Sequence, residues 1–387
     1  MSETIKHVSA FLVDTAGPKA WLFVKLESSS GIVGWGECYT VTGREGAVLA
    51  LIDELAHHLV GRDVHAIRQF TRVAYADFAI KRGSLEFHCA VSGLEIAMWD
   101  IVGKAAEQPV YNLLGGPCRA VFPIYANGWF RNFDGSTQAI DAGARRAAEL
   151  VASGFQALKF DPFPGAWRPF ISRAERECAT ECVGAIRAAV GPKVELLIEA
   201  HRRLSPSIAI KVARDISPFD PFWFEEPVSS SQPEGLAEVR AATDIPIVSG
   251  EDLYMKASFN PLFNARAVDI VNPDVANCGG IIELIEIAAM ADAQLVAVAP
   301  HNYNSPTVGL SATIQACAVM PNFLITEYFV NFAERADEIA LNPLPVENGS
   351  IVLPRSPGIG IELDEAALNK YRGTTTRRAV MRSYAHE

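Results

Sequence analysis

Three glutamates recur at a constant interval in the central part of the chain. Glu199, Glu225 and Glu251 are spaced 26 residues apart, and each stands at the end of a short apolar run. If the runs are neighbouring strands of one parallel sheet, about 4.8 Å separates them and the three carboxylates converge. Such a cluster is electrostatically costly unless a cation lies within it. Carboxylate oxygens with no accompanying Cys/His cluster indicate a hard cation, Mg²⁺ in particular, and argue against zinc.

An aspartate and a histidine follow at nearly the same interval. Asp274 and His301 are 27 residues apart and come after two further apolar runs. On adjacent strands the aspartate would accept a hydrogen bond from one imidazole nitrogen, which fixes the tautomer and raises the basicity of the other nitrogen. The pair therefore predicts a general base at His301.

A second histidine lies close to the first glutamate, in the segment LLIEAHRRL. In an extended strand, residues i and i+2 point to the same face, so we expect Glu199 and His201 to emerge side by side. The pattern alone leaves three roles open for His201: an acid, a base or a further metal ligand.

The residues named so far stand at or just after the ends of apolar runs that alternate with helical patterns, which is typical of repeated βα units. Eight runs are expected to be strands: 122–127, 155–161, 194–200, 222–227, 245–250, 268–273, 294–300 and 322–328. Between the first two, Ser136 and Gly154 are expected to bound a helix. Eight units predict an α/β fold with a (β/α) barrel of the TIM type, whose active site lies at the carboxyl ends of the strands. Further polar residues at those ends are Asn127, Lys159, Asp161 and Glu327.

The first part of the chain has a different pattern. Residues 1–121 contain strand-like segments followed by helical stretches, which predicts a separate α+β domain. We expect the barrel to occupy residues 122–345 and a C-terminal segment, 346–387, to pack back on the first domain.

The composition narrows the class of protein. A net charge of −11 argues against a nucleic-acid partner, which would call for a basic face. No apolar run approaches the length of a membrane span, and the first residues lack the apolar core of a signal peptide. The seven cysteines are scattered without metal-ligand spacing. We expect a cytoplasmic protein with free thiols and no membrane partner.

Seven ordered motifs carry a resemblance to a known family: GWGEC, MWDIVGK leading to LLGG, FEEPV, SGED, NPDVANCGGI, APHN and PGIGIEL. In these motifs the chain resembles the enolase superfamily, specifically its mandelate racemase and muconate lactonizing enzyme branch. The resemblance implies a capping domain over the barrel, one essential Mg²⁺, and removal of the proton next to a substrate carboxylate. It implies that the metal ligands are Glu199, Glu225 and Glu251, that the dyad is Asp274 and His301, and that Glu327 hydrogen-bonds the substrate carboxylate.

The chain departs from the racemases of this branch at the second strand. Racemases carry Lys-x-Lys there, and the second lysine is a base, whereas this chain has Lys159 and Asp161. The departure favours one-base chemistry through His301. Acid-sugar dehydratases of the branch use a carboxylate-x-His pair, usually with aspartate as the ligand. By this resemblance His201 would donate a proton to a departing hydroxyl.

The segments YANGW, ALKFDPF and acidic-x-His-x-Arg are similar to those of gluconate and galactonate dehydratases. The resemblance implies these pocket residues: Asn127, Trp129, Lys159, Asp161 and Arg203. We therefore expect a lyase that dehydrates an aldonate through a metal-stabilised enediolate to a 2-keto-3-deoxy acid. The alternatives are an epimerase, racemase or lactone cycloisomerase with the same enolate chemistry, or a non-catalytic metabolite-binding barrel. The family suggests a homo-oligomer, either a dimer or an octamer.

Overall fold

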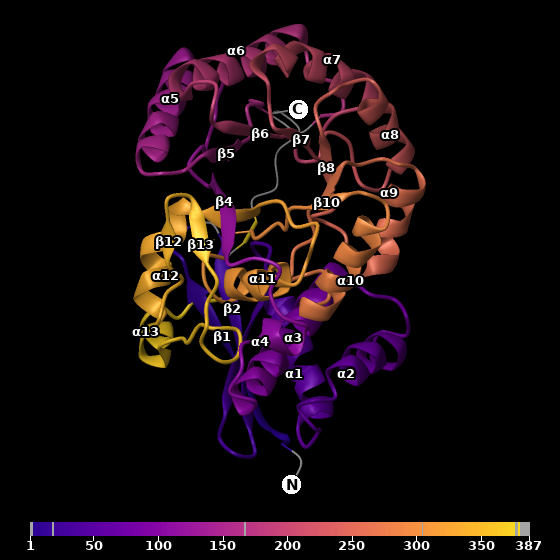
Figure 1. The fold of residues 1–387 in the computed structure, drawn as a ribbon, viewed down its shortest axis with the longest axis vertical. Helices are drawn as coiled ribbons and strands as arrows, with labels where there is room; N and C mark the ends of the chain where they lie inside the picture. Colours follow the sequence, from indigo (N-terminus) through magenta and orange to yellow (C-terminus); the bar gives the residue numbers. More distant parts are fainter. Residues whose placement is uncertain (1–2, 18, 166–167, 304, 376–377, 380–387) are drawn as a thin grey trace.

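The structure is a computed structural model that describes residues 3–17, 19–165, 168–303, 305–375 and 378–379. Within these residues, eight parallel strands follow one another around a barrel (Figure 1). The strands are β4 (Val121–Asn127), β5 (Ala157–Phe160), β6 (Glu195–Glu199), β7 (Trp223–Glu225), β8 (Ile247–Ser249), β9 (Ile270–Val271), β10 (Ala297–Val298) and β11 (Thr326–Phe329). β11 pairs with β4, and a bridge between Val298 and Phe323 closes the ring. The predicted TIM-type barrel is confirmed.

The strands are shorter than the apolar runs that predicted them. The run 294–300 contains only the two-residue strand β10. Leu295 has a φ of +58° and is 97% exposed, so the start of that run is a turn after a helix. An apolar residue in a turn therefore lengthened the predicted strand.

Helices cover the outside of the barrel, in an arc that Figure 1 shows in magenta and orange. Ser136 caps the first of them, because its side chain accepts a hydrogen bond from the backbone N–H of Ala139 at 3.2 Å, as predicted. The helices are α5 (Thr137–Ala152), α6 (Arg173–Val190), α7 (Pro206–Ile216), α8 (Pro233–Ala241), α9 (Asn260–Asn264), α10 (Ile281–Asp292), α11 (Val308–Ala318) and α12 (Ala333–Ile339). In the described part of the chain, no helix is both long and apolar enough to span a membrane.

The interior of the barrel is packed below the strand ends. One buried cluster takes an apolar side chain from each strand or its immediate flank: Tyr125, Ala157, Leu197, Trp223, Val248, Ile270, Ala299 and Ile325. Successive residues of a strand alternate faces, so the residues two positions further along also point inward. In this way the strands direct Lys159, Glu199 and Glu225 into the carboxyl end of the barrel, above the apolar cluster.

The first domain consists of an antiparallel sheet packed on helices. Its sheet contains β1 (Ile5–Asp14), β2 (Ala20–Ser28) and β3 (Val33–Cys38). Its helices are α1 (Glu45–Leu59), α2 (Ile67–Val73), the π-helix η1 (Ala74–Phe78), α3 (Leu85–Ala105) and α4 (Val110–Leu113). A Cβ added at Gly36 would lie 1.8 Å from the carbonyl oxygen of Gly93, so the glycines of GWGEC permit close packing of β3 on α3.

Helix α3 also connects this domain to the rest of the chain. Its buried Glu95 accepts hydrogen bonds from the backbone N–H groups of Ile281 and Ile282 at the start of α10. Its buried Asp100 accepts hydrogen bonds from Trp35 N–H and Ile359 N–H. The capping domain and the barrel are therefore joined through buried carboxylates.

The C-terminal segment contacts both units, and Figure 1 shows it in yellow beside them. Its hairpin, β12 (Val346–Glu347) and β13 (Ser350–Val352), extends the barrel sheet because β13 pairs antiparallel with β4. After α13 (Glu365–Lys370), the Tyr371 carbonyl accepts a hydrogen bond from Asp14 N–H, and Gly373 N–H donates to the Leu12 carbonyl. Residues 376–377 and 380–387 of the predicted segment lie outside the described residues.

Candidate active site at the carboxyl end of the barrel

The three glutamates meet at the carboxyl ends of three neighbouring strands. Glu199 ends β6 and pairs in register with Glu225, which ends β7, while Glu251 follows β8 by two residues. One carboxylate oxygen from each lies within 4.8 Å of the others. Three buried carboxylates at this separation repel one another strongly in a low-dielectric interior.

Lys159 supplies a positive charge to two of these carboxylates, Glu225 and Glu199. Its Nζ lies 2.8 Å from Glu225 Oε1, 2.8 Å from Glu327 Oε1 and 3.7 Å from Glu199 Oε2. Burial raises the pKa of Glu225 well above its usual value, and the charges of Glu199 and Glu251 add to this, although Lys159 opposes them. One ammonium group thus offsets only part of the negative charge.

The cluster suits a hard divalent cation. Glu199 Oε2 is buried and makes no hydrogen bond, so a donor atom points into the cluster without a partner beyond the distant Lys159 ammonium. The three residues all offer carboxylate oxygen, the ligand type that Mg²⁺ and Ca²⁺ prefer. The chemistry of the donors therefore fits the cation that the sequence predicts.

The dyad residues are also adjacent. His301 Nδ1 lies 2.8 Å from Asp274 Oδ2, and Nε2 lies 3.2 Å from Glu251 Oε2 and 3.6 Å from Glu327 Oε2. Burial would lower the pKa of His301, but the charges of Glu327 and Glu251 outweigh it and raise the pKa to about 9. Asp274 thus orients the ring so that Nε2 faces the carboxylate cluster.

His201 lies beside Glu199, but the predicted reason is wrong. The strand β6 ends at Glu199, and His201 is not extended, because its φ is +48°. A left-handed turn instead brings the His201 N–H to Glu199 Oε1, with which it forms a hydrogen bond. The prediction assumed that the strand continued for two more residues.

Asp161 binds His201 and Arg203. His201 Nδ1 lies 2.8 Å from Asp161 Oδ2, and the buried guanidinium of Arg203 forms an ion pair with the same oxygen. Burial would lower the pKa of His201, but Glu199 and the hydrogen bond to Asp161 raise it to about 9. The carboxylate at 161 thus belongs to a second histidine–aspartate pair, at the position where racemases of the branch have a lysine.

The two remaining predicted pocket residues, Asn127 and Trp129, lie in different surroundings. Asn127 reaches the site, because its Nδ2 donates a hydrogen bond to Glu327 Oε1 at 2.7 Å. Trp129 instead packs against Phe130 and Phe160, with ring centroids 5.3 and 5.7 Å away. Phe160 belongs to the layer between strands and helices.

Comparison with known proteins agrees with this geometry. Residues 4–115 match the N-terminal domain model of mandelate racemase and muconate lactonizing enzyme, and residues 142–367 match the enolase C-terminal domain-like model. The chain belongs to the mandelate racemase and muconate lactonizing enzyme family.

Curated relatives in the family are sugar-acid dehydratases. The chain is 34% identical to the D-gluconate dehydratase of Thermoproteus tenax over 91% of this chain and 69% of that protein. It is 34% identical to the D-galactonate dehydratase of Ralstonia pickettii over 90% of each. The solved structure of a mandelate racemase/muconate lactonizing enzyme from Sulfitobacter sp. is 32% identical in sequence to this chain and superposes on it with a TM-score of 0.89. The match covers 99% of this chain and 100% of that protein.

Several contacts of this family member were missed by the sequence analysis. Glu225 accepts hydrogen bonds from Trp223 Nε1 at 2.9 Å and from Asn272 Nδ2 at 3.0 Å. The i, i+2 alternation along β7 could have revealed Trp223. Arg202, which adjoins the predicted Arg203, forms an ion pair with Glu251, and no sequence pattern marks it.

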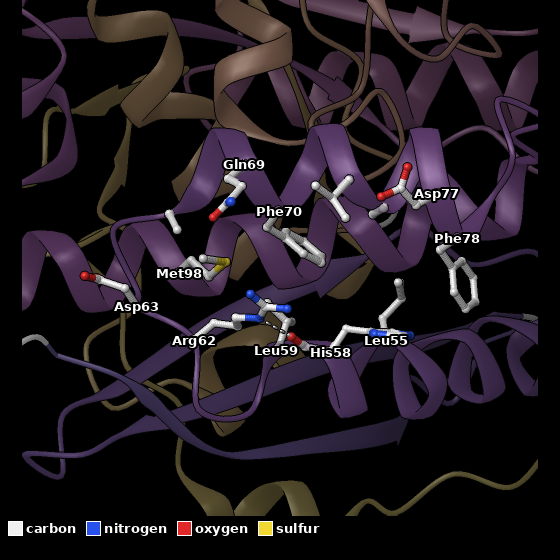
Figure 2. Close-up of a pocket in the computed structure, with 13 residues that line it drawn as sticks. Leu55, His58, Leu59, Arg62, Asp63, Gln69, Phe70, Asp77, Phe78 and Met98 are labelled. Atoms are coloured by element: carbon white, nitrogen blue, oxygen red, sulfur yellow. Dashed lines mark hydrogen bonds between the residues drawn. The ribbon is translucent and has the colours of Figure 1, made fainter.

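A prominent cavity lies away from this site. Figure 2 shows it within the capping domain, where α1, α2, η1 and α3 enclose about 480 Å³. Its lining is largely apolar and includes Leu55, Phe70, Phe78 and Met98. None of the predicted catalytic or metal-binding residues lines it.

Proposed function

We propose that this chain is a Mg²⁺-dependent dehydratase that converts a sugar acid, an aldonate such as gluconate or galactonate, to a 2-keto-3-deoxy acid. One observation carries the proposal: two histidines, each paired with an aspartate at 2.8 Å, flank a single carboxylate cluster. Elimination of water requires a base for the proton and an acid for the hydroxyl, and two oriented imidazoles can supply both. The names of the curated relatives support the same reaction.

In this proposal His301 removes the proton next to the substrate carboxylate. Its Nε2 faces the cluster, while Asp274 holds Nδ1 and stabilises the imidazolium that forms. Mg²⁺ held by Glu199, Glu225 and Glu251 would offset the negative charge that develops on the substrate carboxylate. Glu327, which Lys159 and Asn127 contact, is proposed as an acid whose protonated carboxyl group donates a hydrogen bond to that carboxylate.

His201 then protonates the departing hydroxyl. Asp161, which Arg203 holds in place, lies 2.8 Å from His201 Nδ1, and Glu199 Oε1 lies 3.9 Å from the same nitrogen. Because Asp161 accepts from His201 and Arg203, it is engaged as an orienting carboxylate. This supports elimination over racemization, which would need a base on the second face of the substrate. Trp129 stays a predicted pocket residue, and a homo-oligomer, dimer or octamer, is proposed on the family resemblance.

The test is a screen of sugar acids for the formation of 2-keto acids, with Mg²⁺ present and the reaction run in D₂O. We expect at least one aldonate to give a 2-keto-3-deoxy acid. Recovery of substrate that carries deuterium at C2, with no keto acid from any compound, would contradict the dehydratase proposal and favour an epimerase or racemase. Isomerisation of a lactone without loss of water would favour a cycloisomerase.

A further inference from the structure

A buried lysine of the capping domain lies over the dyad. Lys19 stands just before β2 and is only 3% exposed. Its Nζ donates a hydrogen bond to the backbone carbonyl of Tyr303 at 3.0 Å, across 284 residues of sequence. A lysine side chain is rarely buried this fully unless it has partners, so its placement calls for an explanation.

Two tyrosine rings provide much of the surroundings of this ammonium group. Lys19 Nζ lies 3.9 Å from the ring centroid of Tyr303 and 4.3 Å from that of Tyr39, which follows β3. The two rings lie 5.6 Å apart. A cation that contacts two aromatic faces out of water is bound more tightly than a solvated one.

The same rings pack on the dyad histidine. The Tyr303 ring is nearly parallel to the His301 imidazole, at 12° and 6.0 Å, and the Tyr39 ring lies 6.3 Å from it. The backbone N–H of Tyr303 also donates a hydrogen bond to Asp274 Oδ2 at 3.2 Å. Lys19 is thus connected to both dyad residues through Tyr303.

Nearby carboxylates keep the ammonium charged. Burial lowers the pKa of Lys19 to about 8, and the charges of Asp274 and Glu37 limit the decrease. Glu37, on β3, accepts hydrogen bonds from Ser305 Oγ and from the backbone N–H of Gly309. The capping domain therefore holds the segment after His301 at two places, Tyr303 and residues 305–309.

We propose that Lys19 is a positioning residue for the reaction at His301, because it clamps Tyr39 and Tyr303 against the imidazole and fixes the backbone that follows it. The kinetic part of this inference rests on the proposed dehydratase function. The structural part does not, because it concerns how the capping domain holds the segment 301–303.

The test compares Lys19→Met with Lys19→Arg. Methionine keeps the length and apolar stem but removes the charge, so we expect kcat to fall about thirtyfold, which is about 2 kcal/mol at 1.36 kcal/mol per tenfold change. KM should stay within about twofold, since the lysine acts through His301. Arginine, which also stacks on aromatic rings, should restore most of the loss.

Amide hydrogen exchange gives a readout that needs no substrate. In Lys19→Met we expect faster exchange at the N–H groups of Asn302 and Tyr303, which bond to Glu327 and Asp274. The control is Lys25→Met on β2, because Lys25 is paired with Glu365 on α13. This control should change neither exchange at these amides nor kcat.

Two results would overturn the inference. A rise in KM with kcat unchanged would make Lys19 a substrate contact, and unchanged kcat together with unchanged exchange would make it only a buried structural residue. If Lys19→Met does not fold, Tyr39→Leu removes one aromatic face and should give the same changes in kcat and exchange. Faster exchange in a protein that dehydrates no sugar acid would contradict the proposed function and leave the clamp intact.

Discussion

Buried carboxylates occur in two regions of this molecule and are neutralised in different ways. On α3 of the capping domain, Glu95 and Asp100 accept hydrogen bonds from backbone N–H groups of distant segments, and Asp100 also pairs with Lys104 one turn along the helix. At the strand ends, the carboxylates of Glu199, Glu225 and Glu251 face one another, and their charged partners are side chains. Both groups are buried, so burial alone does not distinguish a structural acid from a catalytic one.

The chemistry of the partners does distinguish them. Backbone amides are fixed donors that stay in place whether or not a ligand is present, and Asp100 also pairs with Lys104 of the same helix at 2.8 Å, so the α3 acids have their partners within the fold. The strand-end acids depend on Lys159, Arg202 and His301, whose charges a bound ion can supplement. We therefore propose the strand-end carboxylates as the functional acids, because they are buried against one another and their balancing charges come from other residues of the candidate site.

The largest expected effect is the loss of the cation. Chelation with EDTA should abolish turnover, and Glu225→Gln should lower Mg²⁺ affinity by at least about a hundredfold, because the substitution removes one charge and one ligand. Titration calorimetry measures the affinity. Glu95→Gln is the matched control and should bind Mg²⁺ normally. Full activity in EDTA, or equal Mg²⁺ affinity in both variants, would contradict the proposal that the strand-end acids, unlike those of α3, bind a cation.

The next largest effect concerns the base. His301→Asn should reduce both dehydration and deuterium incorporation at C2 by about 10²–10⁴-fold, since both require removal of the same proton. Mass spectrometry of the substrate and assay of the keto acid measure the two rates. Normal incorporation by this variant would place the base elsewhere.

A smaller and more selective effect is expected at His201. His201→Asn should block dehydration but leave part of the exchange at C2, because an acid acts only after the proton has been removed. Its Mg²⁺ affinity should change little, since Glu199 is retained. A joint fall of affinity and exchange would make His201 a metal ligand, and loss of exchange at normal affinity would make it the base.

The smallest effect on activity is expected in the capping domain. Glu95→Gln should lower the free energy of unfolding by about 1–3 kcal/mol, because one oxygen that accepts a backbone N–H is replaced by a donor. The kcat of the folded variant should be nearly unchanged. Urea titration gives the stability, and a large loss of kcat at full stability would make Glu95 part of the site.

The raised pKa of Glu95 predicts that the free energy of unfolding depends on pH. Burial raises the pKa of Glu95 to about 7, so between pH 4.5 and 7 the folded state binds more protons than the unfolded state. The Glu95 contribution to the free energy of unfolding therefore falls as pH rises through this window. Urea titrations at pH 5 and pH 8 measure this change. The free energy of unfolding should decrease less between the two pH values in Glu95→Gln than in the parent protein.

Features that repeat at a regular interval along the chain were predictable from the sequence. The barrel follows from the alternation of apolar runs and helices, and the convergence of Glu199, Glu225 and Glu251 follows from their equal spacing. His201 was placed beside Glu199 by an argument that failed, because the end of a strand depends on the left-handed turn that follows it. Strand length and turn geometry depend on packing, which no single run of residues encodes.

Contacts between distant segments were beyond prediction. Lys19 meets Tyr303 across 284 residues, and Glu95 meets Ile281 across 186. Nothing in the residues around either partner indicates the other. Such contacts follow only once the capping domain has been placed on the barrel.

The hydrogen bonds of α3 also bear on the order in which the protein folds. The backbone partners of Glu95 and Asp100 include Ile281, Ile282 and Ile359, which the ribosome adds long after α3. Until then, Asp100 has Lys104 and the Trp35 N–H as partners within the capping domain, but Glu95 lacks its backbone donors. The Glu95 carboxylate must therefore stay solvated or protonated, since burying it without them is costly. We therefore expect its core to close only late in synthesis, in the same cooperative step as the barrel.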